Sequence, residues 1–207
     1  MINGPISSEP CLRKANRRPM VLVAVIGCWA VAVTAGLWSL WRHSLTPGQA
    51  AHAMVSWPAE SKLPREAGRA TLVMTLHPQC PCSRASVTEL EVLMSRCPGK
   101  LTVYVLFAES AGSNIPIEST PLWKSAGQIP GVKTVVDKGG ELTRCFDGQT
   151  SGQVFVYDSQ GVLQFSGGLT ASRGHEGDND GLTAVEAIVN SVVPVVRTTP
   201  VYGCSIW

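Results

Sequence analysis

A long apolar run near the N-terminus dominates the hydrophobic pattern of the chain. Residues 20–41 read MVLVAVIGCWAVAVTAGLWSLW, and no charged residue interrupts these 22 positions. As a helix they would extend for about 33 Å, which is close to the thickness of the apolar core of a bilayer. A buried core helix would normally show some water-facing polar positions, and this run has almost none. The pattern therefore predicts a transmembrane anchor at residues 20–41.

The basic residues around this run predict its orientation. They are Arg13, Lys14, Arg17 and Arg18 on the N-terminal side, against only Arg42 and His43 on the other. Because the side richer in Lys and Arg stays cytoplasmic, we expect a single-pass protein of the cell (inner) membrane, with a cytoplasmic segment at 1–19 and an extracytoplasmic C-terminal domain. Residues 20–41 would contact membrane lipid. A cleaved signal peptide is the alternative, since residues 51–53 read AHA, although its apolar part usually spans about 7–15 residues.

A different hydrophobic pattern follows the anchor. Residues 42–69 are rich in Pro, Gly, Ala and charge, which predicts a linker with a short helix. The predicted strands then cover 70–76, 101–107, 132–136, 154–157 and 162–165, and the predicted helices cover 83–97, 121–128, 140–146 and 182–192. Strands that alternate with helices and end in a hairpin predict an α/β domain with a mixed sheet at 70–195, followed by a tail at 196–207.

Composition narrows the classes of function. The 207 residues suffice for one domain with a core and are too few for two full domains. A net charge of +2 without a basic stripe argues against a nucleic-acid partner. We expect no bound organic cofactor, because Gly174 and Gly177 do not form a phosphate loop. The seven cysteines are an odd number, so at least one thiol stays unpaired or pairs with another molecule.

The stretch HPQCPCS, which covers residues 77–83, carries the most informative chemistry. It lies between a predicted buried strand and the first turn of a predicted helix. Unpaired N–H groups and the positive end of the helix macrodipole stabilise a thiolate at such a place. A thiolate is both a nucleophile and a metal ligand, so the position itself would activate Cys80.

The order strand, cysteine-containing turn, helix and strand resembles thioredoxin. The run VVDKGGELTRCFDGQTSGQVFVYDSQGVLQFSGGL looks like the second half of the TlpA-like branch of membrane-anchored thioredoxins, with the matching residues Phe146, Gly148, Asp158 and Gly161. The strings HPQCPCSRAS, SGGLTASRGHEGDN and TPVYGC are similar to the RedB-type thioredoxin-like proteins. The resemblance covers about residues 70–204 and implies a thioredoxin-like mixed sheet flanked by helices.

Two departures from that family concern its active site. With Cys80 aligned on the first cysteine of the family's Cys-x-x-Cys, Ser83 takes the place of the second, and Cys82 falls one position early. The family also places a cis-proline just before the strand at Val154, where this chain reads Thr-Ser-Gly at 150–152. Since that proline shapes substrate binding in the family, ordinary thioredoxin substrate handling does not carry over automatically.

Three readings of the cysteine pair remain open. In the first, Cys80 attacks the thiols or disulfides of partner proteins, Cys82 resolves the bond, and Ser83 donates a hydrogen bond to the thiolate or caps the helix. A thiol–disulfide oxidoreductase of this kind fits an extracytoplasmic location. In the second, Cys80, Cys82 and His77 bind Cu(I), because soft thiolates and imidazole suit that ion. In the third, the thiols are inert or form a fixed disulfide in an interaction domain.

The polar loop SRGHEGDN at 172–179 follows the last predicted strand, at the end where thioredoxins approach their cysteines. We expect Arg173 or His175 to lie near Cys80, where Arg173 would lower its pKa by charge and His175 could act as general acid or base. The alternative is a solvated loop. Asp178 or Asn179 is predicted to cap the final helix.

Three more cysteines lie in the exported part. Cys97 falls at helical spacing from apolar neighbours and Cys145 lies beside Phe146, so both are predicted to be buried. Cys204, in the tail, could pair with Cys97 or Cys145 or remain a thiol, and the sequence does not choose among these.

Overall fold

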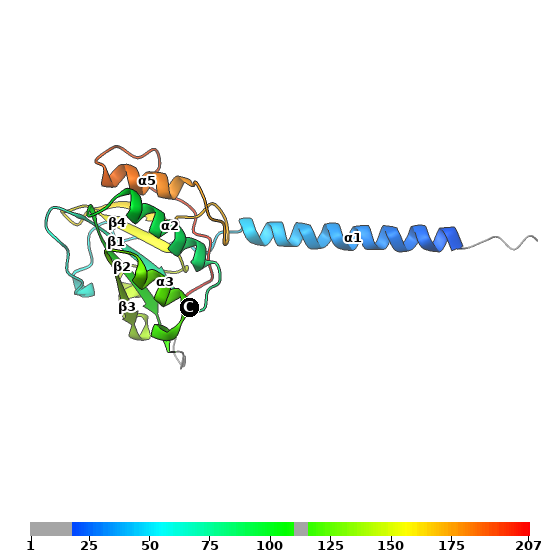
Figure 1. The fold of residues 1–207 in the computed structure, drawn as a ribbon, viewed down its shortest axis with the longest axis horizontal. Coiled ribbons are helices and arrows are strands. Elements are labelled where there is room, and N and C mark those ends of the chain that lie inside the picture. The colour runs from blue at the N-terminus through cyan, green and yellow to red at the C-terminus, as the bar shows by residue number, and fades with distance from the viewer. Residues whose placement is uncertain (1–17, 110–115) are drawn as a thin grey trace, which may run out of the picture. The chain divides into compact units, whose positions relative to one another are not determined.

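The computed structural model describes residues 18–109 and 116–207 (Figure 1). The chain divides into two units, Met1–Trp41 and Arg42–Trp207, which are described separately below. Most of the predicted cytoplasmic segment, with Arg13, Lys14 and Arg17, lies outside the described residues.

The described residues of the N-terminal unit belong to the helix α1, which begins at Arg18 and ends at Leu45. Its mean hydropathy reaches 2.3 in an 18-residue window, and none of that window is buried. By length and composition the helix can cross a membrane. The same properties fit a membrane anchor or a signal sequence, and the orientation drawn from the flanking charges stays a prediction.

The second unit is built on a five-stranded sheet in the order β3-β2-β1-β4-β5. The strands are β1 (Ala70–Leu76), β2 (Leu101–Ala108), β3 (Val132–Asp137), β4 (Gln153–Tyr157) and β5 (Leu163–Gly167). β1, β2 and β3 run parallel, β4 is antiparallel to β1, and β5 is antiparallel to β4. The central strand β1 is therefore paired on both sides, and its carboxyl end leads directly into the cysteine turn.

The helices of this unit are α2 (Ser83–Arg96), α3 (Pro121–Gln128), α4 (Glu141–Cys145) and α5 (Asp180–Val189), with 3₁₀ turns at Ala59–Ser61, Ile117–Ser119 and Lys138–Gly140. Each predicted strand and helix is present within a few residues of its expected bounds. The last helix begins at Asp180 and ends at Val189, so both of its bounds lie before the predicted 182 and 192. The predicted thioredoxin-like mixed sheet flanked by helices is confirmed.

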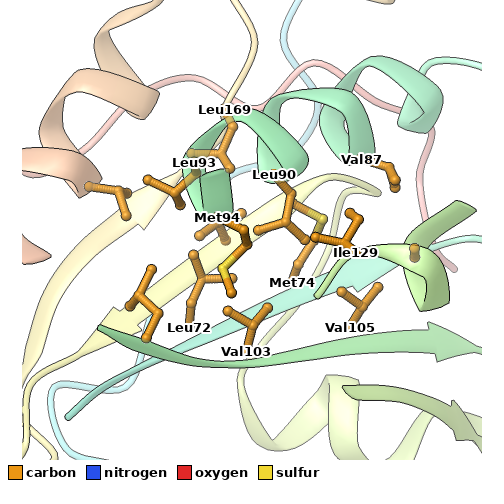
Figure 2. Packing of buried hydrophobic residues seen from close by; sticks show 14 of the residues in the cluster. Leu72, Met74, Val87, Leu90, Leu93, Met94, Val103, Val105, Ile129 and Leu169 are labelled. Carbon is orange, nitrogen blue, oxygen red and sulfur yellow. The ribbon is translucent and has the colours of Figure 1, made fainter. Parts of the chain in front are cut away.

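The larger core lies between one face of the sheet and the helices α2, α3 and α5. Leu72 and Met74 of β1 point to this face because alternate side chains of a strand share a side. Figure 2 shows them facing Leu90 and Leu93 of α2. Full burial of a side chain of this size contributes about 1.5–3 kcal/mol, so this layer fixes α2, and with it the cysteine turn, on the sheet.

A second, aromatic cluster covers the opposite face. Its buried members are Val73, Tyr104, Leu106, Phe146, Phe155 and Tyr157. Trp57, from the segment 42–69 that we predicted to be a linker, packs on this cluster with ring centroids 5.2 Å from those of Phe146 and Tyr157. Ser56 also forms a bridge with Val162. The part of this segment around Trp57 therefore packs against this face of the sheet.

Candidate functional site: three cysteines beside the first strand

The turn between β1 and α2 holds Cys80 in a defined conformation. The Cys80 N–H donates to the His77 carbonyl at 3.1 Å, and the Ser83 N–H donates to the Cys80 carbonyl at 3.2 Å. Cys82 immediately precedes α2 and caps it without a side-chain hydrogen bond. Cys80 thus lies beside the N-terminus of α2, where the helix dipole favours negative charge. Its side chain is buried, with 4% of the residue exposed.

The C-terminal tail forms a second wall of the site. The Ser151 N–H donates to the Cys204 carbonyl at 2.8 Å, and the Ile206 N–H donates to the Gln149 carbonyl at 3.0 Å. Ile206 is only 2% exposed, so the end of the chain is anchored in the fold. Gly203 is required by this close approach, because an added Cβ would lie 1.8 Å from the Ser151 carbonyl oxygen. The tail therefore lies along residues 149–151, just before β4.

The tail brings a third cysteine into the site. The Sγ atoms of Cys80 and Cys204 lie 3.0 Å apart, and the Cys204 N–H donates to the Cys80 Sγ at 3.4 Å. The sulfur atoms of Cys80, Cys82 and Cys204 all lie within 4.8 Å of one another. Cys204 therefore contacts the predicted nucleophile, whereas sequence reasoning had considered only Cys97, Cys145 or no partner for it. Cys97 is buried in the main core instead.

Two buried serines form hydrogen bonds next to Cys80. The Ser83 and Ser151 hydroxyls are 2.7 Å apart, and the Ser151 Oγ accepts from the His77 N–H at 2.7 Å. Both serines are fully buried. Since Ser151 accepts from His77, its own hydroxyl can donate to Ser83, which leaves the Ser83 hydroxyl to donate to a Cys80 thiolate. Ser83, aligned with the second cysteine of the thioredoxin motif, thus contacts Ser151 from the stretch 150–152, where the expected proline is absent.

The pKa of Cys80 is lowered to about 7, below its ordinary value of 9.0. Burial alone would raise this pKa, but hydrogen bonds from Ser83 and Cys204 outweigh it. The donors are the side chain and the backbone N–H of both residues, and all of them favour the thiolate. A large share of Cys80 is therefore deprotonated at neutral pH, which is the form that attacks disulfides and binds soft metals.

The pKa of the neighbouring thiol, Cys204, is shifted in the opposite direction. Burial, the hydrogen bond to Cys80 and the charges of Cys80 and Cys82 raise the pKa of Cys204 to about 12, while the charge of Arg173 opposes them. Cys204 is thus the proton donor in its contact with Cys80. Burial also raises the pKa of Cys97 and of Cys145, which disfavours their reactive thiolate forms. The predicted burial is confirmed for Cys97, whereas Cys145 is only partly buried.

The hydrogen bonds of Arg173 and His175, from the loop 172–179, go to residues other than Cys80. Arg173 donates from its guanidinium to the Gly203 carbonyl, and its Nε donates to the His43 carbonyl at 3.2 Å, so it acts on the tail rather than on Cys80. His175 is exposed, and its backbone N–H donates to the Ser172 carbonyl at 3.3 Å. The group of described residues that could hold a metal ion contains only cysteines and leaves His175 out.

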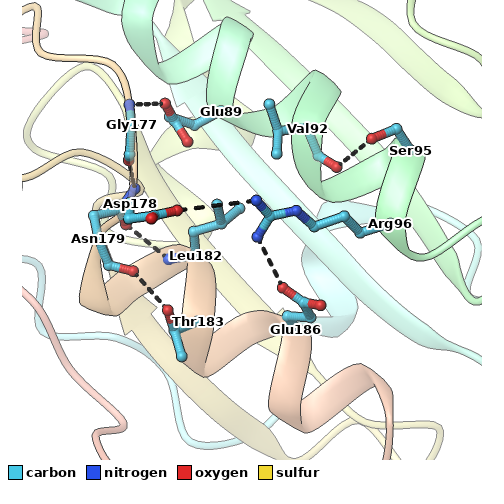
Figure 3. A network of polar contacts seen from close by, with 10 residues as sticks. All are labelled: Glu89, Val92, Ser95, Arg96, Gly177, Asp178, Asn179, Leu182, Thr183 and Glu186. Atoms are coloured by element: carbon cyan, nitrogen blue, oxygen red, sulfur yellow. Dashed lines mark hydrogen bonds and ion pairs between the residues drawn. The ribbon is translucent and has the colours of Figure 1, made fainter.

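The rest of that loop is tied to helices α2 and α5 (Figure 3). The Gly177 N–H donates to the buried Glu89 carboxylate at 2.6 Å, and Asp178 forms a 3.9 Å ion pair with Arg96. The Asn179 Oδ1 accepts from the Leu182 N–H at 2.8 Å, so the prediction of a cap at this position is confirmed for Asn179. These contacts fix where α5 begins and hold it against α2.

An open groove of about 750 Å³ runs beside Cys80 between α2 and α3. Its lining includes Pro78, Cys80 and Arg84 from the cysteine turn and Pro121 and Leu122 from α3. The lining is partly apolar and includes the cationic Arg84 and the acidic Glu91. A substrate sulfur can therefore approach Cys80 from this groove, on a side open to solvent.

The three sulfur atoms also suit a soft metal ion. Cu(I) prefers thiolates, and Cys80, Cys82 and Cys204 could together supply three of them. The predicted third ligand, His77, is not part of this group; its Nδ1 accepts from the Gln79 N–H at 3.2 Å. Burial lowers the pKa of His77, so its imidazole is neutral at pH 7. In this structure Cys204 takes the place that sequence reasoning gave to His77.

No protein-family model matches the chain, and a search of curated proteins finds no match. Among solved structures, a hypothetical protein from Sinorhizobium meliloti 1021 is similar at 22% identity with a TM-score of 0.55, over 79% of this chain and 94% of that one. An uncharacterized conserved protein from Geobacillus kaustophilus is similar at 18% identity with a TM-score of 0.56, over 79% and 93%. A secreted Mycobacterium tuberculosis disulfide oxidoreductase, homologous to E. coli DsbE, gives 10% identity and a TM-score of 0.43, over 61% and 84%. At these identities the first two likenesses show a shared fold.

Proposed function

We propose that this protein is a membrane-anchored, extracytoplasmic thiol–disulfide oxidoreductase in which Cys80 is the nucleophile. The proposal rests on the surroundings and the lowered pKa of Cys80. It is a thiol beside a helix N-terminus, with several donors aimed at its sulfur and a pKa of about 7. A thiol with a pKa near ambient pH combines a large thiolate fraction with good nucleophilicity.

The reaction begins when the Cys80 thiolate attacks one sulfur of a partner disulfide through the groove beside α3. A mixed disulfide forms at Cys80, and the other partner sulfur leaves as a thiolate that takes a proton from solvent. A second thiol of this protein then attacks the Cys80 sulfur, which releases the partner as a dithiol and leaves an internal disulfide. Sequence reasoning gave this second role to Cys82, whose sulfur lies within 4.8 Å of Cys80. The two electrons gained by the partner come from the two cysteines.

The apolar helix supports the location in this proposal. Residues 20–41 can span a bilayer, and the basic residues before them would hold the N-terminus in the cytoplasm. The oxidoreductase domain would then face an oxidising compartment, where disulfide exchange is useful. Its partners would be extracytoplasmic protein thiols and disulfides.

A kinetic assay tests the proposal on the full chain in detergent. The reduced protein is mixed with a chromogenic aromatic disulfide, and the released thiol is followed at pH 7. We expect a fast phase that Cys80→Ser abolishes and that Cys145→Ser leaves unchanged. Equal rates for the wild-type protein and Cys80→Ser would contradict the role of Cys80 and would favour a non-catalytic interaction domain.

A second candidate function is Cu(I) binding, which the cluster of three sulfurs favours. Cys80 is already about half ionised at pH 7, and thiols bind such an ion as thiolates. Such a protein would carry or deliver Cu(I) as cargo rather than exchange disulfides. The two functions share Cys80 and are separated by copper titration, described in the Discussion.

A further inference from the structure

The C-terminal tail places a thiol in contact with the nucleophile from across the fold. We propose that Cys204, rather than Cys82, is the thiol that closes the disulfide with Cys80. This inference rests on the proposed role of Cys80 as nucleophile. The redox centre would then join the β1–α2 turn to the end of the chain, so that the tail belongs to the catalytic machinery.

The backbone holds this pair ready for bond formation. The Sγ atoms are 3.0 Å apart, and a disulfide bond is about 2.05 Å long, so the two sulfurs need to approach by about 1 Å. Side-chain rotation can supply that movement, because the Cys204 backbone already contacts both Ser151 and the Cys80 sulfur. The steric fit of Gly203 against Ser151 keeps the tail at this distance.

The turn conformation disfavours the alternative bond to Cys82. Cys82 has helical angles, φ −67° and ψ −26°. The Ser83 N–H donates to the Cys80 carbonyl and the Arg84 N–H donates to the Pro81 carbonyl, so this segment already forms helical turns. A Cys80–Cys82 bond would have to distort this turn, which leads into α2, and strain its hydrogen bonds.

The charges around Cys204 change in the required direction during the reaction. When Cys80 is a thiolate, the Cys204 thiol is the donor in their contact, and the negative charge of Cys80 raises the pKa of Cys204. Once Cys80 is part of a mixed disulfide, its charge is gone, whereas the favourable charge of Arg173 remains. Cys204 then loses its proton more readily and becomes the attacking thiolate when it is needed.

The complete step is balanced in atoms and electrons. The Cys204 thiol gives its proton to solvent and its sulfur attacks the Cys80 sulfur. The bond between Cys80 and the partner breaks, and the partner leaves as a thiolate that takes up a proton. Cys80 and Cys204 are oxidised together by two electrons, and the partner disulfide is reduced to two thiols. Run in reverse, the same step oxidises a partner dithiol.

Disulfide mapping on the full chain in detergent tests this pairing. The reduced protein is treated with oxidised glutathione and digested with trypsin, which cleaves after Arg69, Arg84 and Arg197. We expect a cross-link between peptides 70–84 and 198–207 in the wild type and in Cys82→Ser, where Cys80 is the only cysteine left in the first peptide. We expect Cys204→Ser to accumulate glutathione on Cys80 at least tenfold above the wild type, while the matched control Cys145→Ser behaves as the wild type.

The opposite pattern overturns the pairing. If Cys204→Ser still closes a disulfide within peptide 70–84, and Cys82→Ser accumulates the glutathione adduct, then Cys82 is the partner and the proposed oxidoreductase function still stands. If Cys80 accepts no glutathione in any variant, the proposed function fails and the pairing fails with it. Fragmentation of the wild-type cross-link checks the assignment without relying on a variant, because it shows whether Cys80 or Cys82 carries the bond.

Discussion

The sulfur atoms of Cys80 and Cys204 lie 3.0 Å apart, although the two residues are separated by 124 positions in the chain. One follows the central strand, and the other belongs to a tail fixed along residues 149–151. In this contact the pKa of Cys80 is lowered and the pKa of Cys204 is raised, so Cys80 is the thiolate and Cys204 is the donor. The reactivity of Cys80 therefore depends on the end of the chain, and the predictions below follow from that dependence.

The reactivity of Cys80 should follow its pKa. A thiolate is the attacking form, so the rate of alkylation at Cys80 should rise as the pH increases through about 7 and should level off above pH 8. Cys97 and Cys145, whose pKa values are raised, should stay slow throughout this range. The measurement is iodoacetamide labelling from pH 5 to 9 with site-resolved mass spectrometry. A midpoint at Cys80 near its ordinary value of 9.0 would show that the donors do not act on it.

Removal of the Ser83 hydroxyl should weaken this activation. Ser83→Ala takes away a donor to the thiolate, and a hydrogen bond to a charged group contributes about 1.5–3 kcal/mol. We expect the pKa of Cys80 to rise by roughly one unit or more and its alkylation at pH 6 to slow roughly tenfold. Ser95→Ala is the matched control, because Ser95 is an exposed residue of α2 whose hydroxyl donates to the Val92 carbonyl of the same helix. Equal midpoints in the two variants would exclude a role for Ser83.

A larger side chain at Gly203 should detach the tail. In Gly203→Ala the new Cβ would meet the Ser151 carbonyl oxygen at 1.8 Å, so the tail must move and carry Cys204 away from Cys80. We expect the yield of the Cys80–Cys204 disulfide to fall severalfold and the pKa of Cys80 to rise. Gly127→Ala is the control, since its Cβ would meet only the Thr134 side chain at 3.9 Å. An unchanged disulfide yield in Gly203→Ala would show that the tail is not held as described.

Oxidation should stabilise the domain strongly if the disulfide joins distant residues. A bond that closes a loop of 124 positions restricts the unfolded chain and contributes about 3–5 kcal/mol, whereas a bond between Cys80 and Cys82 closes almost no loop. We expect the Tm of the oxidised protein to exceed that of the reduced protein by roughly 10 °C. Thermal unfolding of both forms in detergent, followed by circular dichroism, measures the difference. Superimposable unfolding curves would speak against a long-range disulfide.

Copper titration separates the second candidate function from the first. If the three sulfurs bind Cu(I), Cys204→Ser should weaken binding at least tenfold, because it removes one of three thiolates. His77→Ala should bind as the wild type, since His77 is outside the cluster. Competition with a chromogenic Cu(I) chelator under anaerobic conditions gives the affinities. Equal affinities for the wild type and a variant that lacks both Cys80 and Cys204 would exclude a copper site here.

The fold and the part of the site in the β1–α2 turn could be predicted, because both follow from patterns among neighbouring residues. The apolar and β-branched run at 70–76, the helical spacing from Ser83 and the cysteine turn between them lie in one short stretch, so strand, turn and helix follow from pattern alone. The functional meaning of Ser83 was also visible, as a serine in the place of a family cysteine. Its contact with Ser151 was not, because nothing local indicates which residue of 150–152 points toward it.

The part of the site that the C-terminal tail supplies depends on long-range packing, which leaves no periodic pattern in the sequence. The tail has no helix or strand of its own, and its hydrogen bonds along 149–151, together with the one from Arg173 to the Gly203 carbonyl, place Cys204 at the site. The loop 172–179 was expected at Cys80 because of its position after the last strand. Instead, the buried carboxylate of Glu89 holds Gly177, and Arg173 reaches the tail. A buried acid in the middle of an amphipathic helix is hard to foresee, since its partner is a backbone N–H from a distant loop.

The measurement that tests the central claim most directly is a redox titration of the full chain. The protein is equilibrated in detergent with glutathione buffers of increasing oxidised fraction, quenched with acid, and its thiols at Cys80, Cys82 and Cys204 are counted by mass after alkylation. The account predicts a reversible two-electron transition in which the thiols of Cys80 and Cys204 disappear together at one midpoint. Cys80 that remains a thiol in every buffer, or that is oxidised irreversibly, would contradict it.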